Sequence, residues 1–296
     1  MFMKVLNFGS LNIDKVYAVP HIVVPGETIS STGYSQGAGG KGANQSTAMA
    51  KAGLNVFHAG KIGSDGLWLI DTLSSYGVDT SLIMRDGSVT GQAIIQVAAD
   101  GQNSIVLFPG ANHEITTNEI DDVLSHFGSG DLLVLQNEIL NLGYVIEEAK
   151  KREMMVCFNA APYGDNVHAL PLCKLDFLVV NEIEGAGIAG LMPGGEFPVL
   201  ARHLARLYPQ TEIVLTVGAA GAYYAFRDEL FHAPIIDAPV VDTTGAGDTF
   251  LGYFLASRLK GMDMSQSLHM ASVASALSVS RAGAGVSIPY AWEVFG

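Results

Sequence analysis

The chain has 296 residues, and its 16 basic and 29 acidic side chains give a formal net charge of −13. This balance argues against a nucleic-acid or anionic-membrane surface, although backbone amides and a metal can still hold a phosphate. The apolar runs are far shorter than the roughly 20 residues of a membrane helix. The first six residues lead into a strand-like run with no signal peptide, so we expect a cytoplasmic protein. Cys157 and Cys173 lie in or near apolar stretches and are expected to be reduced core residues.

Strand-like and helix-like segments alternate along most of the chain. This alternation is typical of a mostly parallel sheet covered by helices on both faces, and the length fits one large α/β domain or two smaller ones. The predicted strands are residues 4–8, 56–60, 132–136, 155–159, 177–180 and 213–217, and the predicted helices are residues 44–52, 67–76, 144–152, 199–208 and 251–260.

Two regions, about 16–35 and 92–108, interrupt this alternation with strand patterns and turn signals. Asp100-Gly101 is typical of a hairpin turn between residues 93–98 and 103–108. The two regions predict a small second sheet that covers one end of the main sheet as a lid. The alternative is two surface excursions with no shared role.

A glycine-rich segment, residues 37–42, fits the dinucleotide pattern G-x-G-x-x-G. That pattern must directly follow a buried strand, and the residues before it are polar, so a Rossmann site is not expected. The segment fits two other interpretations equally well. In one, Lys41 and Asn44 hydrogen-bond a small polar ligand beside the glycines. In the other, the glycines only form a tight strand-to-helix turn.

Polar side chains recur at the carboxyl ends of predicted strands, where α/β sheets place their ligands. Asn12 and Asp14 follow the first strand and could grip vicinal hydroxyls, or they could form a polar turn. Glu184 could contact magnesium through water, or could be an exposed carboxylate at a helix start. Together they predict a shared cleft, with further members Glu138, Asn159 and Asn181.

A second glycine-containing segment, residues 216–221, follows another apolar strand. Its glycines would let a nucleotide approach the backbone closely. The alternative is a plain hairpin turn into residues 223–226, since glycine is common in turns.

The most informative segment is residues 242–250, DTTGAGDTF, placed directly before a helical run. The backbone N–H groups of Gly245, Ala246 and Gly247 can form an anion site at the helix N-terminus. Asp248 lies beside that site. A general base next to an anion site is what transfer of a phosphoryl group to a hydroxyl requires.

These motifs together resemble the PfkB, or ribokinase-like, family of carbohydrate kinases. Residues 39–45 resemble the first family signature in its ribokinase form, and residues 242–250 resemble the second signature completely. Asn181-x-x-Glu184 matches the family's N-x-x-E motif, and the match extends over about residues 7–289. The resemblance implies a single kinase domain over residues 1–296, with a three-layer α/β/α fold and a β-sheet lid.

The resemblance also implies a role for individual residues. Asp248 would be the catalytic base, and the N–H groups of Gly245, Ala246 and Gly247 would stabilise the transferring phosphoryl group. The sugar would be held by Asn12, Asp14, Gly40, Lys41, Asn44, Glu138 and Asp248. ATP would be lined by Asn181, Thr216, Gly218, Ala219 and Gly221, with Ser272 near the adenine. Glu184 would hold Mg²⁺ through water, and Asp242, Thr244, Ser278, Arg281, Gly283 and Ser287 would surround a monovalent cation, usually K⁺.

The implied reaction is ATP-dependent phosphorylation of a pentose at its primary hydroxyl, with D-ribose as the expected sugar. Residues 108–112, FPGAN, also resemble ribokinases, whereas Asn159-Ala160-Ala161-Pro162 departs mildly from the commoner N-P-A-P. A homodimer through the lid is implied as well. The alternatives are a kinase of the same fold for deoxyribose, fructose or a nucleoside such as adenosine, and a non-catalytic sugar-binding regulator. A Rossmann oxidoreductase is the weakest.

Overall fold

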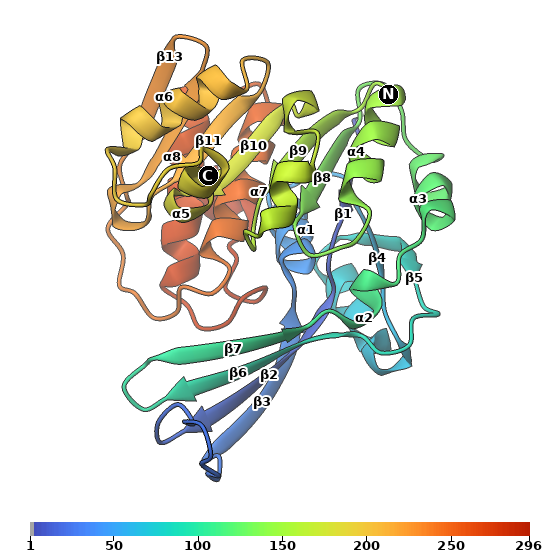
Figure 1. Ribbon diagram of the computed structural model, residues 1–296, viewed down its shortest axis with the longest axis vertical. Helices are drawn as coiled ribbons and strands as arrows, with labels where there is room; N and C mark the ends of the chain where they lie inside the picture. The colour runs from blue at the N-terminus through green and yellow to red at the C-terminus, as the bar shows by residue number, and fades with distance from the viewer. Residues whose placement is uncertain (1–2) are drawn as a thin grey trace.

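The computed structural model describes residues 3–296 and contains one large sheet and one small sheet (Figure 1). The large sheet consists of β1 (Val5–Phe8), β4 (Val56–Lys61), β5 (Asp79–Met84), β8 (Leu132–Gln136), β9 (Met155–Asn159), β10 (Phe177–Asn181), β11 (Glu212–Thr216), β12 (Ala222–Phe226) and β13 (Glu229–Ala233). Their order is β13-β12-β11-β10-β9-β8-β1-β4-β5. Neighbours from β5 to β11 pair in parallel, and β12 and β13 complete the sheet as antiparallel strands.

Helices cover both faces of the large sheet, each over its own apolar core. One core contains residues of α1 (Lys41–Lys51), α2 (Leu67–Ser75), α7 (Ala246–Leu259) and α8 (Met264–Val279). The other contains residues of α3 (Thr117–Leu124), α4 (Leu142–Lys151), α5 (Glu182–Ile188) and α6 (Phe197–Leu207). A short helix, α9 (Ala291–Val294), lies near the C-terminus. The predicted three-layer α/β/α fold is confirmed.

Strand β8 shows why continuous apolar runs predict this architecture. Leu132 and Val134 belong to one core, and Leu133 and Leu135 belong to the other. Successive side chains of a strand point to opposite faces, so a strand between two helical layers must be apolar at every position.

The small sheet consists of β2 (Asn12–Val19), β3 (Gly33–Gly39), β6 (Gly91–Ala98) and β7 (Asn103–Phe108), in the order β3-β2-β6-β7. It projects away from the main body (Figure 1). The predicted second sheet is therefore confirmed, including the hairpin of β6 and β7. Because β2 already begins at Asn12, the alternative of a polar turn at Asn12 and Asp14 is wrong.

Helix α1 begins at Lys41, three residues before the predicted start. Gly40 has a φ of 92°, a left-handed value that suits glycine, and it ends the extended run of β3. Lys41 and Asn44 therefore lie in the first turn of a helix.

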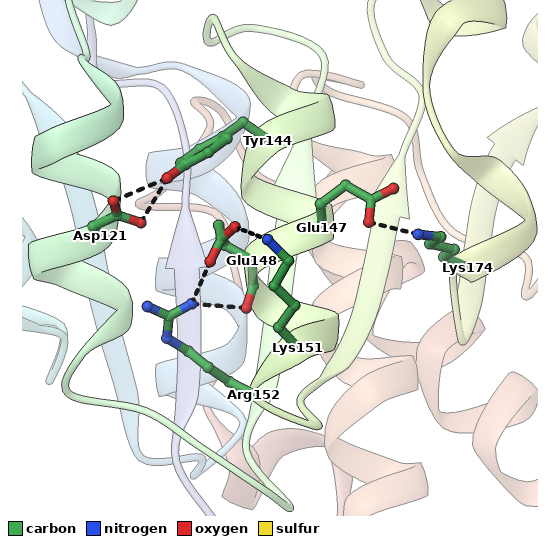
Figure 2. A network of polar contacts seen from close by, with 7 residues as sticks. All are labelled: Asp121, Tyr144, Glu147, Glu148, Lys151, Arg152 and Lys174. Carbon is green, nitrogen blue, oxygen red and sulfur yellow. Dashed lines mark hydrogen bonds and ion pairs between the residues drawn. The ribbon is translucent and has the colours of Figure 1, made fainter.

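A polar network lies on the surface of α3 and α4 (Figure 2). The Tyr144 hydroxyl donates to Asp121, and Glu148 pairs with Lys151 and Arg152. Glu147 pairs with Lys174 in the same way. Exposed ion pairs contribute little to stability, so the packing of these helices depends mainly on their buried apolar faces.

Two expectations from composition have different outcomes. Cys157 is buried as predicted, but Cys173 is exposed, so the core prediction is wrong there. Its neighbours Leu172 and Leu175 occupy the buried positions of that turn. Within residues 3–296, no helix combines the length and the apolar character needed to cross a bilayer.

Helices α1 and α7 approach each other closely at Gly252. A Cβ atom on Gly252 would lie 2.5 Å from the Cβ of Ala48 and 3.0 Å from the Ala48 carbonyl carbon. Gly252 lies one turn after Asp248, and Ala48 lies one turn after Asn44. The absence of a side chain at Gly252 therefore sets how close the residues at the helix starts can come.

We predict that Gly252→Ala lowers the free energy of unfolding by about 1–3 kcal/mol, because the new methyl group overpacks the contact with Ala48. Gly143→Ala on α4 is the matched control, since its Cβ would meet nothing closer than 3.9 Å. The control should gain about 0.5 kcal/mol from helix propensity. Urea unfolding of both variants measures these effects, and changes of equal sign would contradict the packing argument.

Candidate active site

The carboxylate of Asp248 lies between the N-terminus of α7 and the first turns of α1. Gly245, with a left-handed φ of 74°, turns the chain into α7 and leaves Asp248 in its first turn. Asp248 is only 7% exposed. Its Oδ1 accepts a hydrogen bond from Gln45 Nε2 at 2.9 Å, and its Oδ2 accepts one from Asn44 Nδ2 at 3.2 Å. The two helices therefore share a buried, hydrogen-bonded carboxylate.

The charges around Asp248 are one buried lysine and several carboxylates. Burial raises the pKa of Asp248, while Lys41 and the two amide donors act against that shift. Burial alone would lower the pKa of Lys41, but the carboxylates of Asp248, Glu138 and Glu184 outweigh it and raise that pKa. Lys41 therefore stays protonated among several acids, ready to meet an anion.

Glu138 fixes the start of α1 from the end of β8. Its Oε2 accepts the backbone N–H of Lys41 at 3.0 Å and also accepts the Ser10 hydroxyl. Burial raises the pKa of Glu138, and the Ser10 and Lys41 contacts oppose this. The adjacent Gly42 packs against backbone, since a Cβ there would lie 2.4 Å from the Ser10 nitrogen. The glycines thus serve the tight geometry of this turn, and the dinucleotide pattern begins on β3, at the edge of the small mixed sheet, and ends in the first turn of α1.

Asn12 and Asp14 bring the small sheet to the same site. Asn112 Nδ2 donates to Asn12 Oδ1 at 2.8 Å, and Asn112 Oδ1 accepts the backbone N–H of Leu11 at 3.0 Å. Burial, together with the nearby Glu138, raises the pKa of Asp14 to about 7. Gly39 leaves room for this carboxylate, because a Cβ there would lie 2.1 Å from Asp14 Oδ1.

A cavity of about 530 Å³ opens on the other side of the α7 N-terminus. Ala246 and Gly247 of α7 line it, together with apolar side chains such as Ile235, Val240 and Phe250. Its size and apolar wall suit a planar base with attached phosphates. Every residue predicted for the nucleotide lines this cavity: Asn181, Thr216, Gly218, Ala219, Gly221 and Ser272.

Residues 216–221 combine the two interpretations left open by the sequence. Strands β11 and β12 pair as an antiparallel hairpin around this segment, so it is a turn. The same turn lines the cavity.

Asn181 and Glu184 form a capping box at the start of α5. Glu184 accepts the backbone N–H and the side-chain amide of Asn181, both at 2.9 Å, and it is buried. The alternative of a helix-start carboxylate is therefore right about its place but wrong about its exposure. Residues 3–296 contain no group of three or more His, Cys, Asp or Glu side chains able to hold a metal. Magnesium in kinases usually takes most of its ligands from phosphates and water.

Two of the residues predicted for a monovalent cation, Thr244 and Gly283, contact the Asp242 side chain. Its Oδ1 accepts from the Thr244 hydroxyl at 2.7 Å, and its Oδ2 accepts from the Gly283 N–H at 2.9 Å. Burial alone would raise the pKa of Asp242, but these hydrogen bonds lower it. Ser278 and Ser287 share a buried hydrogen bond of 2.9 Å, whereas the guanidinium of Arg281 pairs with Glu293. An ionised carboxylate beside a threonine hydroxyl fits a cation of low charge.

Several residues of this site had no role from the sequence. Gln45 contacts Asp248, Ser10 contacts Glu138, and Asn112 holds Asn12. Gln45 and Asn112 lie within the segments 39–45 and 108–112 that resemble the family, and this resemblance could have marked them as site residues. The apolar wall at Ile235 and Val240 belongs to an irregular loop, where no periodic pattern marks it.

Comparison with known proteins agrees with this geometry. Residues 3–291 match the model of the pfkB family carbohydrate kinases. The chain belongs to the PfkB family. It is an ATP-dependent carbohydrate kinase by that membership. A ribokinase of Staphylococcus aureus is 32% identical over 99% of both chains, and a deoxyribokinase of Salmonella typhi is 31% identical over 97% of this chain and 96% of its own. A crystal structure of a Cryptococcus neoformans ribokinase in complex with ADP matches with a TM-score of 0.88 at 35% identity, covering 100% of this chain and 99% of that one.

The raised pKa of Asp14 gives this PfkB protein a pH-dependent stability. The pKa is 3.8 for an unperturbed group and about 7 in the folded, sugar-free protein, so the unfolded state releases this proton first as pH rises. The stability of the fold therefore falls from about pH 4 to about pH 7, where only the unfolded state has lost this proton, and the Asp14 contribution is constant above that. We predict that Asp14→Asn raises the Tm more at pH 8 than at pH 5, measured by thermal melts. An equal gain at both pH values would contradict the raised pKa.

Proposed function

We propose that this kinase transfers the γ-phosphoryl group of ATP to the primary hydroxyl of a pentose, forming ribose 5-phosphate from D-ribose. One observation carries the proposal. The first turn of α7 presents Ala246 and Gly247 to the nucleotide cavity and Asp248 to the cluster that holds Lys41, Asn44 and Glu138. The relatives named ribokinase support ribose as the sugar.

In the proposed reaction, Asp248 accepts the proton of the primary hydroxyl as its oxygen bonds to the γ-phosphorus. The bond between that phosphorus and the bridging oxygen breaks, and ADP leaves. The N–H groups of Gly245, Ala246 and Gly247 and the ammonium of Lys41 stabilise the charge of the transferring group. In this structure the Ala246 N–H donates to the Thr243 carbonyl at 3.2 Å, so it must exchange that contact for the phosphate.

Two ions complete the proposed site. Mg²⁺, with Glu184 bound through water, supplies neutralisation of charge on the ATP phosphates. Asp242 and Thr244 would hold K⁺, with Ser278, Arg281, Gly283 and Ser287 at the remaining positions, and the bound ion would keep the backbone before Gly245 in place. Neither ion needs to touch the sugar.

The small sheet is the proposed lid. Asn12 and Asp14 lie on β2, so closing this sheet over the cluster at Lys41 would hold the sugar and exclude water that could hydrolyse ATP. β7 carries exposed Ile105, Val106 and Leu107, which supports the proposal that the lid also forms a homodimer. A cytoplasmic location and the absence of nucleic-acid and membrane partners stay predictions.

A second candidate is a kinase for deoxyribose, favoured by the deoxyribokinase relative at 31% identity. Fructose and adenosine remain alternatives from the sequence, and a non-catalytic sugar-binding regulator is disfavoured by the intact Asp248 cluster. Coupled ADP release with ribose, deoxyribose, fructose and adenosine separates these candidates. Turnover that is highest on ribose supports the proposal. Turnover only on another acceptor would contradict ribose as the substrate and identify that acceptor instead.

We predict that Asp248→Asn lowers kcat on the preferred sugar by about 10²–10⁴-fold, because a positioned general base contributes that much. ATP should still bind, since Asp248 does not line the nucleotide cavity. The coupled assay measures kcat, and calorimetric titration with ATP provides the control. Full activity in the variant would remove Asp248 from its proposed role.

We also predict that K⁺ activates the enzyme and that Asp242→Asn raises the K⁺ concentration for half-activation roughly tenfold, because loss of one full charge from an ion's ligand set is worth at least about 1 kcal/mol. The assay titrates KCl at constant ionic strength with choline chloride. A variant with the same K⁺ response as the parent enzyme would place the ion elsewhere.

A further inference from the structure

A buried chain of side-chain amides extends from Asp248 into the core. Gln45 Nε2 donates to Asp248, and Gln45 Oε1 accepts from Gln136 Nε2 at 2.7 Å. Gln136 Nε2 also donates to Asn7 Oδ1 at 2.9 Å. Asn7, Gln45 and Gln136 are each 0% exposed. Such a buried chain calls for a reason beyond packing, since burying polar groups is unfavourable unless they are well paired.

The direction of the chain follows from the charge of Asp248. An ionised carboxylate only accepts hydrogen bonds, so Gln45 must turn its nitrogen toward Asp248 and its oxygen toward Gln136. Gln136 must then present its nitrogen to Gln45 and Asn7. Asn7 in turn donates to the Gly42 carbonyl at 2.8 Å and to the Ser46 hydroxyl at 2.9 Å. Each amide thus fixes the orientation of the next.

The chain carries a defect that fits this direction. Gln136 Oε1 is buried and has no hydrogen-bond partner within residues 3–296. Turning the Gln136 amide round would bring this oxygen against Gln45 Oε1 and Asn7 Oδ1, two acceptors. The unpaired oxygen is therefore the consequence of an orientation in which Gln136 donates to Gln45, and Gln45 in turn donates to Asp248.

We propose that Gln45 is a positioning residue that holds the Asp248 carboxylate in its reactive orientation, and that Gln136 and Asn7 fix Gln45 for this task. The inference rests on the proposed role of Asp248 as base. Gln45 touches no predicted sugar or nucleotide position other than Asp248, and its remaining contact is with Asn159 Oδ1 at 3.1 Å.

The test uses Gln45→Met, which keeps the length of the side chain and removes its donor. Removing a donor to the carboxylate should raise the pKa of Asp248, so the acid limb of the kcat profile should move up by about one pH unit. We expect kcat at pH 7 to fall roughly tenfold and KM for ATP to stay within about twofold. The charged groups facing Asp248 are Lys41, Glu138 and Glu184, and they are the same in parent and variant.

Two further variants separate positioning from loss of packing. Thr47→Val, also buried on α1, removes a hydroxyl that bonds only to the Ala43 carbonyl, and it should leave the pH profile unchanged. Gln136→Met removes the amide that donates to Gln45 Oε1. It should move the acid limb of the kcat profile in the same direction as Gln45→Met, but by a smaller amount. A Gln45→Met enzyme with the kcat and pH profile of Thr47→Val would overturn the proposal.

A measurement without turnover keeps this test independent of the sugar. Carbon-13 NMR titration of the Asp248 carboxyl in the sugar-free protein, assigned with Asp248→Asn, reads its pKa in the parent and in Gln45→Met. A higher pKa in the variant supports the positioning role, and an unchanged pKa contradicts it. If the parent enzyme phosphorylates no sugar, the proposed function fails, while this titration still decides the role of Gln45.

Discussion

The hydrogen bonds from Asn44 and Gln45 to the buried carboxylate of Asp248 are the constraint on which the rest of the site depends. They join residues 203 and 204 positions apart in the sequence and connect α1 to α7. Helix α1 follows β3 of the small sheet, whose strand β2 carries two of the sugar-binding candidates, Asn12 and Asp14. Helix α7 follows the loop of the proposed cation and begins beside the nucleotide cavity. The close contact of Gly252 with Ala48 lets these two helix starts meet.

The site around Asp248 also collects several carboxylates in buried positions, where their ionised form lowers the stability of the fold. Burial raises the pKa of Asp14, Glu138, Glu184 and Asp248, which means that each carboxylate is less stable there than in water. Lys41 and a set of N–H and amide donors offset part of this penalty. Active sites commonly sacrifice stability in this way. The proposed site would also explain how a chain with a net charge of −13 binds a phosphate, since one lysine and backbone N–H groups would face it locally.

The sequence predicted the layers well because a strand between two helical layers must be apolar at every position, as in residues 132–135. It also placed Asp248 at the start of a helix that follows glycines, as α7 confirms, whereas the anion site there stays a prediction. It failed where tertiary contacts decide. Asn7, Gln45 and Gln136 are polar residues within core segments, and only the packing of α1 on β1 and β8 shows that they connect to Asp248. Cys173 was misplaced because its neighbouring leucines fill the core.

The central claim is that Asp248 and the α7 N-terminus meet around the primary hydroxyl of the sugar. The most direct measurement is NMR of the product formed from ATP–Mg and uniformly ¹³C-labelled D-ribose. The account predicts a single phosphorylated product whose phosphorus couples to C5. Phosphorus attached at C1 or another ring carbon, or ADP release with the sugar unmodified, would contradict it.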